Sequence, residues 1–233
     1  MKVAAIQSSY IPWKGYFDII RSVDTFIFLD DVQYTVRDWR SRNRIKTRQG
    51  LKWLSVPVGN DTRRLIHEVA IPDAVWQEKH WKALVHAYSK TPYFSHYAAL
   101  IEEFYRGRIW SNLSEMNQWF TRTIARECLG ITTRFCDSRE FSAEGRKLDR
   151  LIDLVRKCGA SAYLSGPSAQ EYIIDERFAE AGIALAYKDY SGYPEYPQTH
   201  GSFEHAVSIL DLLFHVGPEA PRYIWGWREE GGA

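Results

Sequence analysis

The chain has 233 residues, of which 45% are hydrophobic and 25% are charged. This balance is typical of a folded globular protein and excludes a disordered, collagen-like or coiled-coil chain. The 30 Lys and Arg against 29 Asp and Glu leave a formal net charge of +1, so the chain as a whole lacks the charge of a nucleic-acid or membrane-surface binder.

The cysteines and the apolar runs indicate the compartment. The three cysteines, Cys128, Cys136 and Cys158, form neither a CxxC pair nor an even disulfide framework, which favours a reducing, cytoplasmic location without a structural zinc site. No apolar run approaches the roughly 20 residues that cross a bilayer, and residues 1–6 lead into polar residues instead of a signal-peptide apolar region. We therefore expect a soluble protein that does not insert into a membrane.

The first 30 residues predict a βαβ unit. Val3–Ile6 is a short apolar strand, Pro12 suits the first turn of a helix, and Thr25–Leu29 is an almost continuously apolar second strand. Continuous apolarity is typical of a strand buried on both faces of a parallel sheet.

Residues 32 to about 130 interrupt this pattern. Leu51–Val58 and Ile66–Ile71 are expected to be extended and to pair antiparallel around the turn residues Gly59–Asp61. Three helices should follow, beginning near Asp73, Pro92 and Leu113, the last one ending before Gly130.

The α/β alternation then resumes. Strands are predicted at Ile131–Cys136, Ala162–Leu164 and Ile183–Tyr187, and helices at Leu148–Cys158, Glu176–Ala181 and Phe203–Val216. The prediction is one α/β domain over residues 1–233, with a five-stranded, mostly parallel sheet of Rossmann-like or HUP-like topology. Its insertion, at about 32–130, should hold the antiparallel strands and then the three helices.

Several segments resemble the successive motifs of the WbqC-like protein family. They are Ile6-Gln7, Tyr10–Phe17, Phe28–Tyr34, Arg42–Lys46, Trp53–Val58, Tyr163–Gly166 and Ser208–Phe214. Ser8 and Ser9 depart from the Gln-Pro-Asn-Tyr pattern that the family usually shows near its start. The resemblance implies a bacterial protein encoded among surface-polysaccharide (O-antigen) genes, with an amino-acid (glycine) transferase role on a sugar; it assigns no catalytic residue.

Polar residues follow the predicted strands, at the edge where parallel sheets bind ligands. Asp30 and Asp31 are the carboxylate pair that we single out, one as a general base and the other as a brace for the loop, with an ordinary turn as the alternative. The remaining strand-end candidates for substrate binding are Gln7, Tyr10, Trp13, Ser165, Gly166 and Lys188.

Cations recur at every second position around Asn43, which is itself a candidate for substrate binding. If the segment is extended, Arg40, Arg42, Arg44, Lys46 and Arg48 lie on one face, and their mutual repulsion favours an anionic ligand. A nucleotide sugar, a lipid-linked diphosphate sugar or an RNA acceptor stem would satisfy this row. The alternative is a solvated hairpin neutralised by Asp30, Asp31 and Asp38.

The aromatic segment near residue 195 is a candidate sugar or nucleobase platform. Tyr193, Tyr196 and Gln198 lie among prolines that stiffen the loop, and His200 follows as a candidate base. Structural packing of the C-terminal part explains the rings nearly as well. His80 and His86 are six residues apart, which is not the spacing of two metal ligands on one helix face, so no metal is expected.

These features predict a transferase that adds an aminoacyl (glycyl) or acyl group to an amino sugar or nucleotide sugar. The cation row would hold diphosphate, the aromatic segment would hold the sugar or base, and Asp30 or His200 would deprotonate the amine. Aminoacyl-tRNA, an acyl-carrier thioester, and ATP with a free amino acid all remain open as donors, and no cofactor is indicated. The alternative is a non-catalytic protein that binds a nucleotide sugar or glycan.

Overall fold

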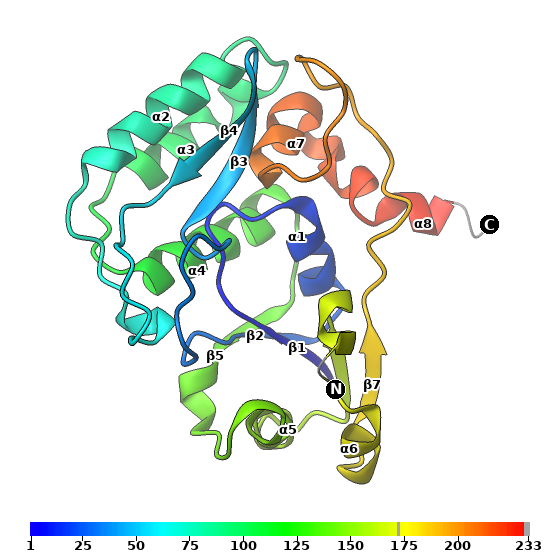
Figure 1. Ribbon diagram of the computed structural model, residues 1–233. Coiled ribbons are helices and arrows are strands. Elements are labelled where there is room, and N and C mark those ends of the chain that lie inside the picture. Colours follow the sequence, from blue (N-terminus) through cyan, green and yellow to red (C-terminus); the bar gives the residue numbers. More distant parts are fainter. Residues whose placement is uncertain (172, 231–233) are drawn as a thin grey trace.

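A parallel five-stranded sheet organises the protein, whose computed structural model describes residues 1–171 and 173–230 (Figure 1). Its strands, in the spatial order β5-β2-β1-β6-β7, are β5 (Arg134–Asp137), β2 (Thr25–Phe28), β1 (Lys2–Ile6), β6 (Ala162–Ser165) and β7 (Ala184–Tyr187). The α/β class with a five-stranded parallel sheet is therefore confirmed. The third predicted strand begins three residues late, at Arg134, because the Ile131 amide still donates to the Ala125 carbonyl and closes the preceding helix.

Helices cover both faces of this sheet, which explains the apolar strands. Ala4, Phe26 and Phe28 pack in the core beside α1 (Lys14–Arg21). Their neighbours Val3, Ala5 and Ile27 pack in a second core, with α5 (Lys147–Lys157) and α6 (Asp175–Glu180). Figure 1 shows α1 on one side of the strands and α5 with α6 on the other. Alternate residues of one strand thus enter different cores.

Between β2 and β5 lie an antiparallel hairpin and then a block of helices, which are the kinds of element that the sequence predicted for this insertion. The elements are β3 (Arg42–Thr47), β4 (Gly50–Ser55), η1 (Ile66–Glu68), α2 (Val75–Tyr88), α3 (Phe94–Arg106), α4 (Leu113–Thr123) and the π-helical turn η2 (Ile124–Cys128). The rest of the chain forms the 3₁₀ segments η3 (Ser138–Phe141), η4 (Pro167–Glu171) and η5 (Gly217–Tyr223), and the helices α7 (Ile209–Val216) and α8 (Gly226–Glu230).

The predicted partner of residues 51–58 is wrong. β4 pairs with β3, from Arg42 opposite Ser55 to Thr47 opposite Gly50, and the 66–71 segment begins with the 3₁₀ turn η1. The hairpin reverses at Arg48-Gln49. The next residue, Gly50, has a φ of +103°, which residues other than glycine rarely adopt. Turn chemistry at Gln49-Gly50 therefore sets the pairing in place of Gly59–Asp61.

The last long helix is shorter than predicted. α7 begins at Ile209 because the Ser208 side chain accepts a hydrogen bond from the Leu210 amide and caps the helix there. Residues before it run across other elements: the Ser208 amide donates to the Arg44 carbonyl at 2.9 Å and the Ile209 amide to the Pro12 carbonyl at 2.8 Å. Among the described residues, no helix combines the length and apolarity that crossing a membrane requires.

Candidate functional site

The order of the strands reverses between β1 and β6. From β1 the chain continues to α1 on one face, whereas from β6 it continues to α6 on the opposite face. The loops after two adjacent strands therefore diverge, and a crevice opens between them, which is where open parallel sheets bind ligands.

Two cavities meet at this crevice. The α1-face cavity has a volume of about 580 Å³ and the α5-face cavity about 960 Å³. Both are lined by Ile6 and Gln7 after β1 and by Gly166 and Ser168 after β6. We call the two together the switch-point crevice.

Arg40 is the cation of the α1-face cavity. Its guanidinium donates to Gln7 Oε1 at 3.1 Å and lies 3.6 Å from the Asp38 carboxylate. The Arg40 backbone is fixed as well, since its carbonyl accepts a hydrogen bond from the Asn117 amide at 2.8 Å. Held in this way, the guanidinium keeps donors available for an anion with little further loss of side-chain freedom.

Aromatic rings form one wall of the α1-face cavity. The Trp13 and Tyr190 rings meet edge to face with centroids 5.2 Å apart, and the Tyr16 hydroxyl donates to the Gln7 carbonyl at 3.0 Å. A Cβ at Gly15 would lie 2.2 Å from Trp13 Cζ2, so this glycine makes room for the indole against the first turn of α1. The space beside Gly15 is therefore occupied by Trp13 and is not open to a ligand.

The loop between β1 and α1 is held in a strained conformation. Ile11, a β-branched residue, has a φ of +37°, and the carbonyls of Tyr10 and Ile11 both accept from Asn43 Nδ2. Strain of this kind persists only where surrounding contacts fix the backbone, and it is frequent at functional sites.

The α5-face cavity adds residues that the sequence reasoning missed. It is lined by Arg146 and Lys147 at the start of α5, by Asp149 in the first turn of that helix, and by Arg177 of α6. Asp149 and Arg177 are paired at 2.6 Å. The position of these residues could have been predicted, because a helix that connects two parallel strands begins at the carboxyl edge of the sheet. The sequence prediction considered only the residues directly after each strand and therefore missed them.

Six predicted binding residues line the crevice. They are Gln7, Trp13, Arg40, Asn43, Ser165 and Gly166. The amide of Asn43 is committed to backbone contacts, because its Nδ2 serves the Tyr10 and Ile11 carbonyls and its Oδ1 accepts from the Arg44 amide.

Asp30 is placed beneath the crevice and has no exposed surface. Its carboxylate accepts from the Ser8 amide at 2.8 Å, from the Ser114 hydroxyl and from Gln118 Nε2 at 3.3 Å. Burial raises the pKa of this carboxyl, and the three hydrogen bonds partly oppose that rise. The exposed strand end that we expected is closed because Ser8 and α4 cover it.

Asp31 points toward the opposite face of the sheet. It pairs with Arg150 of α5 and accepts from the Ser138 hydroxyl at 2.6 Å. The two adjacent carboxylates thus serve different structural contacts, and neither lines the described cavities.

Three cations of the row, Arg42, Arg44 and Lys46, lie in the strand β3, whereas Arg40 and Arg48 lie in turns, and the members meet different partners. Arg42 stacks on the Trp53 ring at 4.2 Å, and Arg44 donates to the Ala206 carbonyl at 3.0 Å. Lys46 is buried, where it donates to Gln198 Oε1 at 2.6 Å and to the Ser202 carbonyl. Only Arg40 lines the switch-point crevice, and the proposed neutralisation by Asp30 and Asp31 does not occur.

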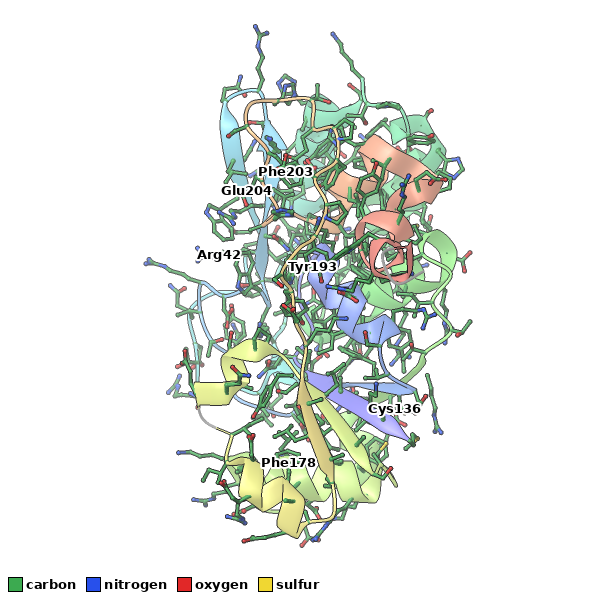
Figure 2. The ribbon with its side chains drawn as sticks, turned by 90° about the vertical axis from the view of Figure 1, so that its right-hand side faces the viewer. Arg42, Cys136, Phe178, Tyr193, Phe203 and Glu204 are labelled. Carbon is green, nitrogen blue, oxygen red and sulfur yellow. The ribbon has the colours of Figure 1, made fainter. Side chains whose placement is uncertain are left out.

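The aromatic segment packs against the interior. Tyr193 donates to Asp18 at 2.6 Å, and Lys188 pairs with the same carboxylate at 2.6 Å. Tyr196 and Gln198 both donate to the buried Asp211 at 2.8 Å. Figure 2 shows Tyr193, Phe203 and Glu204 along the segment that runs beside the hairpin bearing Arg42.

Two other predicted residues lie away from the crevice. Tyr10 is buried in the helical block, where its hydroxyl meets His80 Nδ1 at 2.8 Å and the Tyr105 hydroxyl at 2.6 Å. His200 lines a separate cavity of about 990 Å³ beside Arg48. Among the described residues, no cluster of three or more His, Cys, Asp or Glu side chains could hold a metal ion.

Comparisons with known proteins extend over nearly the whole chain. A curated relative from Mycobacterium tuberculosis (strain ATCC 25618 / H37Rv), named uncharacterized protein Rv1507c, is 46% identical over 225 residues, covering 96% of this chain and 97% of the relative. No solved structure matches the chain significantly. The profile of the WbqC-like protein family matches residues 7–223, so the chain belongs to the WbqC-like protein family.

Proposed function

We propose that the protein binds a nucleotide sugar in the switch-point crevice and transfers an aminoacyl (glycyl) or acyl group to its amino sugar, in the cytoplasm, during bacterial surface-polysaccharide biosynthesis. The observation that carries the binding half is Arg40, held by Gln7 and Asp38 at the mouth of a cavity walled by Trp13 and Tyr190. A guanidinium suits a diphosphate, and aromatic rings suit a base or a sugar face.

The combined crevice is large enough for such a ligand. A cavity of about 580 Å³ shares four lining residues with one of about 960 Å³, and the second carries Arg146, Lys147 and Arg177. Small-molecule sites commonly enclose about 300–1,000 Å³. A ligand that crosses the strand ends would place its charged groups near these cations and its ring systems near Trp13.

The transfer half requires an amine. Its nitrogen would attack the acyl carbon of an aminoacyl-tRNA or an acyl-carrier thioester, a new C–N bond would form, and the bond from that carbon to the donor's oxygen or sulfur would break. The amine must lose a proton, and Asp149 is the carboxylate among the described residues that line the crevice. Its pairing with Arg177 would have to loosen for it to act as the base.

One observation favours the non-catalytic alternative. The described residues lining the α1-face cavity include no carboxylate, imidazole or thiol. The Tyr16 phenol there is a poor base, because burial raises its pKa well above the ordinary value. A nucleotide-sugar-binding accessory protein needs only the cations and rings.

Calorimetry and mass spectrometry separate the two functions. Arg40→Ala should weaken binding of a nucleoside-diphosphate amino sugar at least tenfold while hardly changing binding of the free amino sugar, since the guanidinium meets the diphosphate. Arg42→Ala is the matched control, because Arg42 stacks on Trp53 outside the crevice. Equal losses for both variants would refute the crevice as the binding site.

Mass spectrometry of the nucleotide sugar, incubated with protein and each donor, then tests transfer. A mass gain of one aminoacyl or acyl group supports the transferase. Tight binding without any mass change supports the accessory protein.

A further inference from the structure

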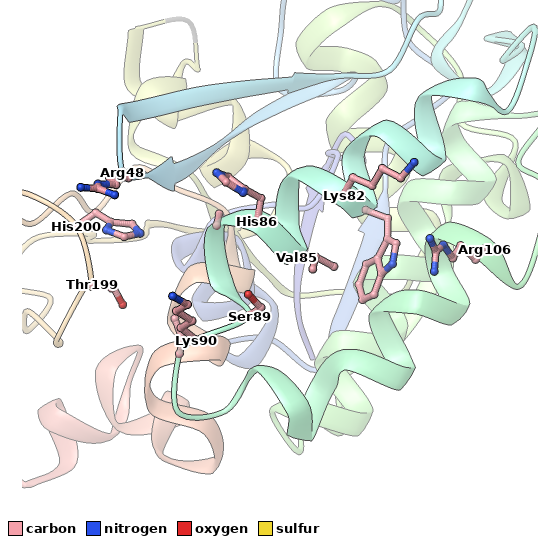
Figure 3. A pocket seen from close by; sticks show the side chains of 12 residues that line it. Arg48, Lys82, Val85, His86, Ser89, Lys90, Arg106, Thr199 and His200 are labelled. Carbon is pink, nitrogen blue, oxygen red and sulfur yellow. The ribbon is translucent and has the colours of Figure 1, made fainter.

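A second cavity lies at the other end of the hairpin. It has a volume of about 990 Å³ and is formed by the β3–β4 turn, the end of α2 and the loop at residue 200 (Figure 3). β3 rises about 3.3 Å per residue, so its six residues separate this cavity from the switch-point crevice by roughly 17 Å. We call it the basic cavity.

The charge of this lining is one-sided. None of the lining residues is acidic. Two of its cations are neutralised from outside, since Glu78 pairs with Lys82 at 3.2 Å and with Arg106 at 2.8 Å. Among the described lining residues, the basic side chains that have no hydrogen-bond or ion-pair partner are Arg48, His86, Lys90 and His200.

These four groups come from three segments and surround one hollow. Figure 3 shows Arg48 and His200 side by side at one edge, His86 on the last turn of α2, and Lys90 just beyond that helix. Arg48 and Lys90 carry like charges that repel each other, and a ligand with two or more negative charges relieves that repulsion.

The loop that carries His200 is anchored on both sides. The Thr199 amide and hydroxyl contact His215 Nε2 at 3.0 and 2.8 Å. Lys46 donates to Gln198 Oε1 at 2.6 Å and to the Ser202 carbonyl. The Arg48 turn is fixed as well, because the Thr47 hydroxyl donates to the Gly50 carbonyl at 2.8 Å. The basic cavity is therefore built before any ligand arrives.

An apolar floor completes the cavity. Trp81 and Ala87 lie mostly buried beneath the cations, with the half-buried Val85 beside them. We propose that the basic cavity binds a small phosphorylated organic molecule, with its phosphate groups among Arg48, His86, Lys90 and His200 and its organic part on this floor. This site is independent of the proposed function, because it shares no lining residue with the switch-point crevice.

The test uses pyrophosphate and phenyl phosphate as probes, titrated calorimetrically at low and high salt. The wild-type protein should bind both saturably, and the double variant Arg48→Ala/Lys90→Ala should bind at least tenfold more weakly. Both side chains are exposed and unpaired, so the variant should keep its fold, which circular dichroism checks. Phenyl phosphate should bind more tightly than inorganic phosphate, because its ring meets the floor.

Arg63→Ala is the matched control. Arg63 is an exposed arginine paired with Asp61 outside the cavity, so its loss should change both affinities less than twofold. Absence of saturable binding to the wild-type protein, or an equal loss in Arg63→Ala, would overturn the proposal. Loss of both probes in Arg40→Ala would do the same, because it would place phosphate binding in the switch-point crevice.

Phosphatidylglycerol vesicles distinguish a soluble ligand from a lipid headgroup. Sedimentation with these vesicles that depends on Arg48 and Lys90, without binding of either soluble probe, would replace the proposal by a membrane-surface contact. Binding of the soluble probes without sedimentation supports it.

Discussion

The residue that changes its role most is Asp30. A carboxylate at the end of a buried strand is a natural candidate for a base, yet every described contact of Asp30 holds protein parts together. It ties the loop after β1, through the Ser8 amide, to Ser114 and Gln118 of α4. Because Gln7 begins that loop, we infer that Asp30 positions the floor of the crevice without touching a ligand.

Asp30→Asn should therefore lower stability. The amide NH₂ would have to face one of three donors, and leaving a buried donor unpaired costs about 1–3 kcal/mol. For a chain of this size each kcal/mol shifts the Tm by roughly 2–4 °C, so thermal unfolding should show a fall of several degrees.

Asp61→Asn is the control for that loss, since the Asp61 carboxylate is exposed and its ion pair with Arg63 is of the kind that contributes little. An unchanged Tm in Asp30→Asn, combined with lost turnover in a working transferase assay, would restore Asp30 as the base.

Lys14 is the second residue whose environment leads to a measurable prediction, in this case for stability. Its ammonium is enclosed by the rings of Tyr193 and Tyr196, 4.8 and 5.4 Å from their centroids, and among the described residues it donates only to the Pro194 carbonyl, at 3.4 Å. Burial lowers the pKa of Lys14 to about 8, although the Asp211 carboxylate opposes the shift.

This shift predicts how stability depends on pH. Between about pH 8 and the ordinary lysine value of about 10.5, the unfolded chain keeps a proton on Lys14 that the folded protein has lost. The folded protein is therefore penalised below pH 8, and it gains stability as pH rises from 8 to 10.5. Denaturant unfolding of the wild type and Lys14→Met at pH 7, 9 and 10 should show the wild type gaining on the variant with pH. Parallel curves would show that Lys14 holds its proton equally well in both states.

At the scale of elements, the start of α1 and the hairpin together build the α1-face cavity. Trp13 folds back over Gly15, and Asn43 of β3 holds the strained loop that precedes it. Asn43 of the hairpin therefore fixes the backbone of this wall through its hydrogen bonds, and Arg40, just before the hairpin, adds the positive charge.

Gly15→Ala should displace the Trp13 ring. The added methyl would lie 2.2 Å from Trp13 Cζ2, and overpacking of this kind typically costs about 1–3 kcal/mol. The Tm should fall by several degrees, and the near-ultraviolet circular dichroism should change because the Trp13–Tyr190 contact is lost.

Gly166→Ala is the matched control on the facing side of the same crevice, because an added Cβ would meet no atom within 4 Å and the φ of Gly166 is not in the left-handed region. A Gly15→Ala variant as stable as Gly166→Ala would show that the indole moves away without cost.

At the scale of the whole molecule, the sheet was predictable and much of the site was not. Strands buried on both faces leave continuous apolar runs, which located the central strands β1 and β2, whereas the partly exposed edge strands β5 and β7 were located from the α/β alternation. The partner of β4 was missed because strand pairing depends on which turn closes, and Gln49-Gly50 carries a weaker signal than Gly59–Asp61.

The site residues show why the sequence pattern does not predict which polar side chains face the crevice. Arg40 and Lys46 belong to one alternating row, yet one faces the crevice and the other is buried against Gln198. Tyr196 and Gln198 have the composition of a sugar platform, but their partner is Asp211, which follows them in α7. In the sequence, a polar side chain that bonds to a residue far along the chain looks the same as one that binds a ligand.

The passage of residues 206–209 across the hairpin and α1 has a consequence for the order of events during synthesis. Their hydrogen bonds to Arg44 and to the Pro12 carbonyl close the wall of a cavity whose other residues lie mostly in the first 43. A ribosome must therefore deliver residue 209 before that wall exists. Until that point in synthesis, the Pro12 and Arg44 carbonyls lack the amides of Ile209 and Ser208 that close this wall in the folded protein.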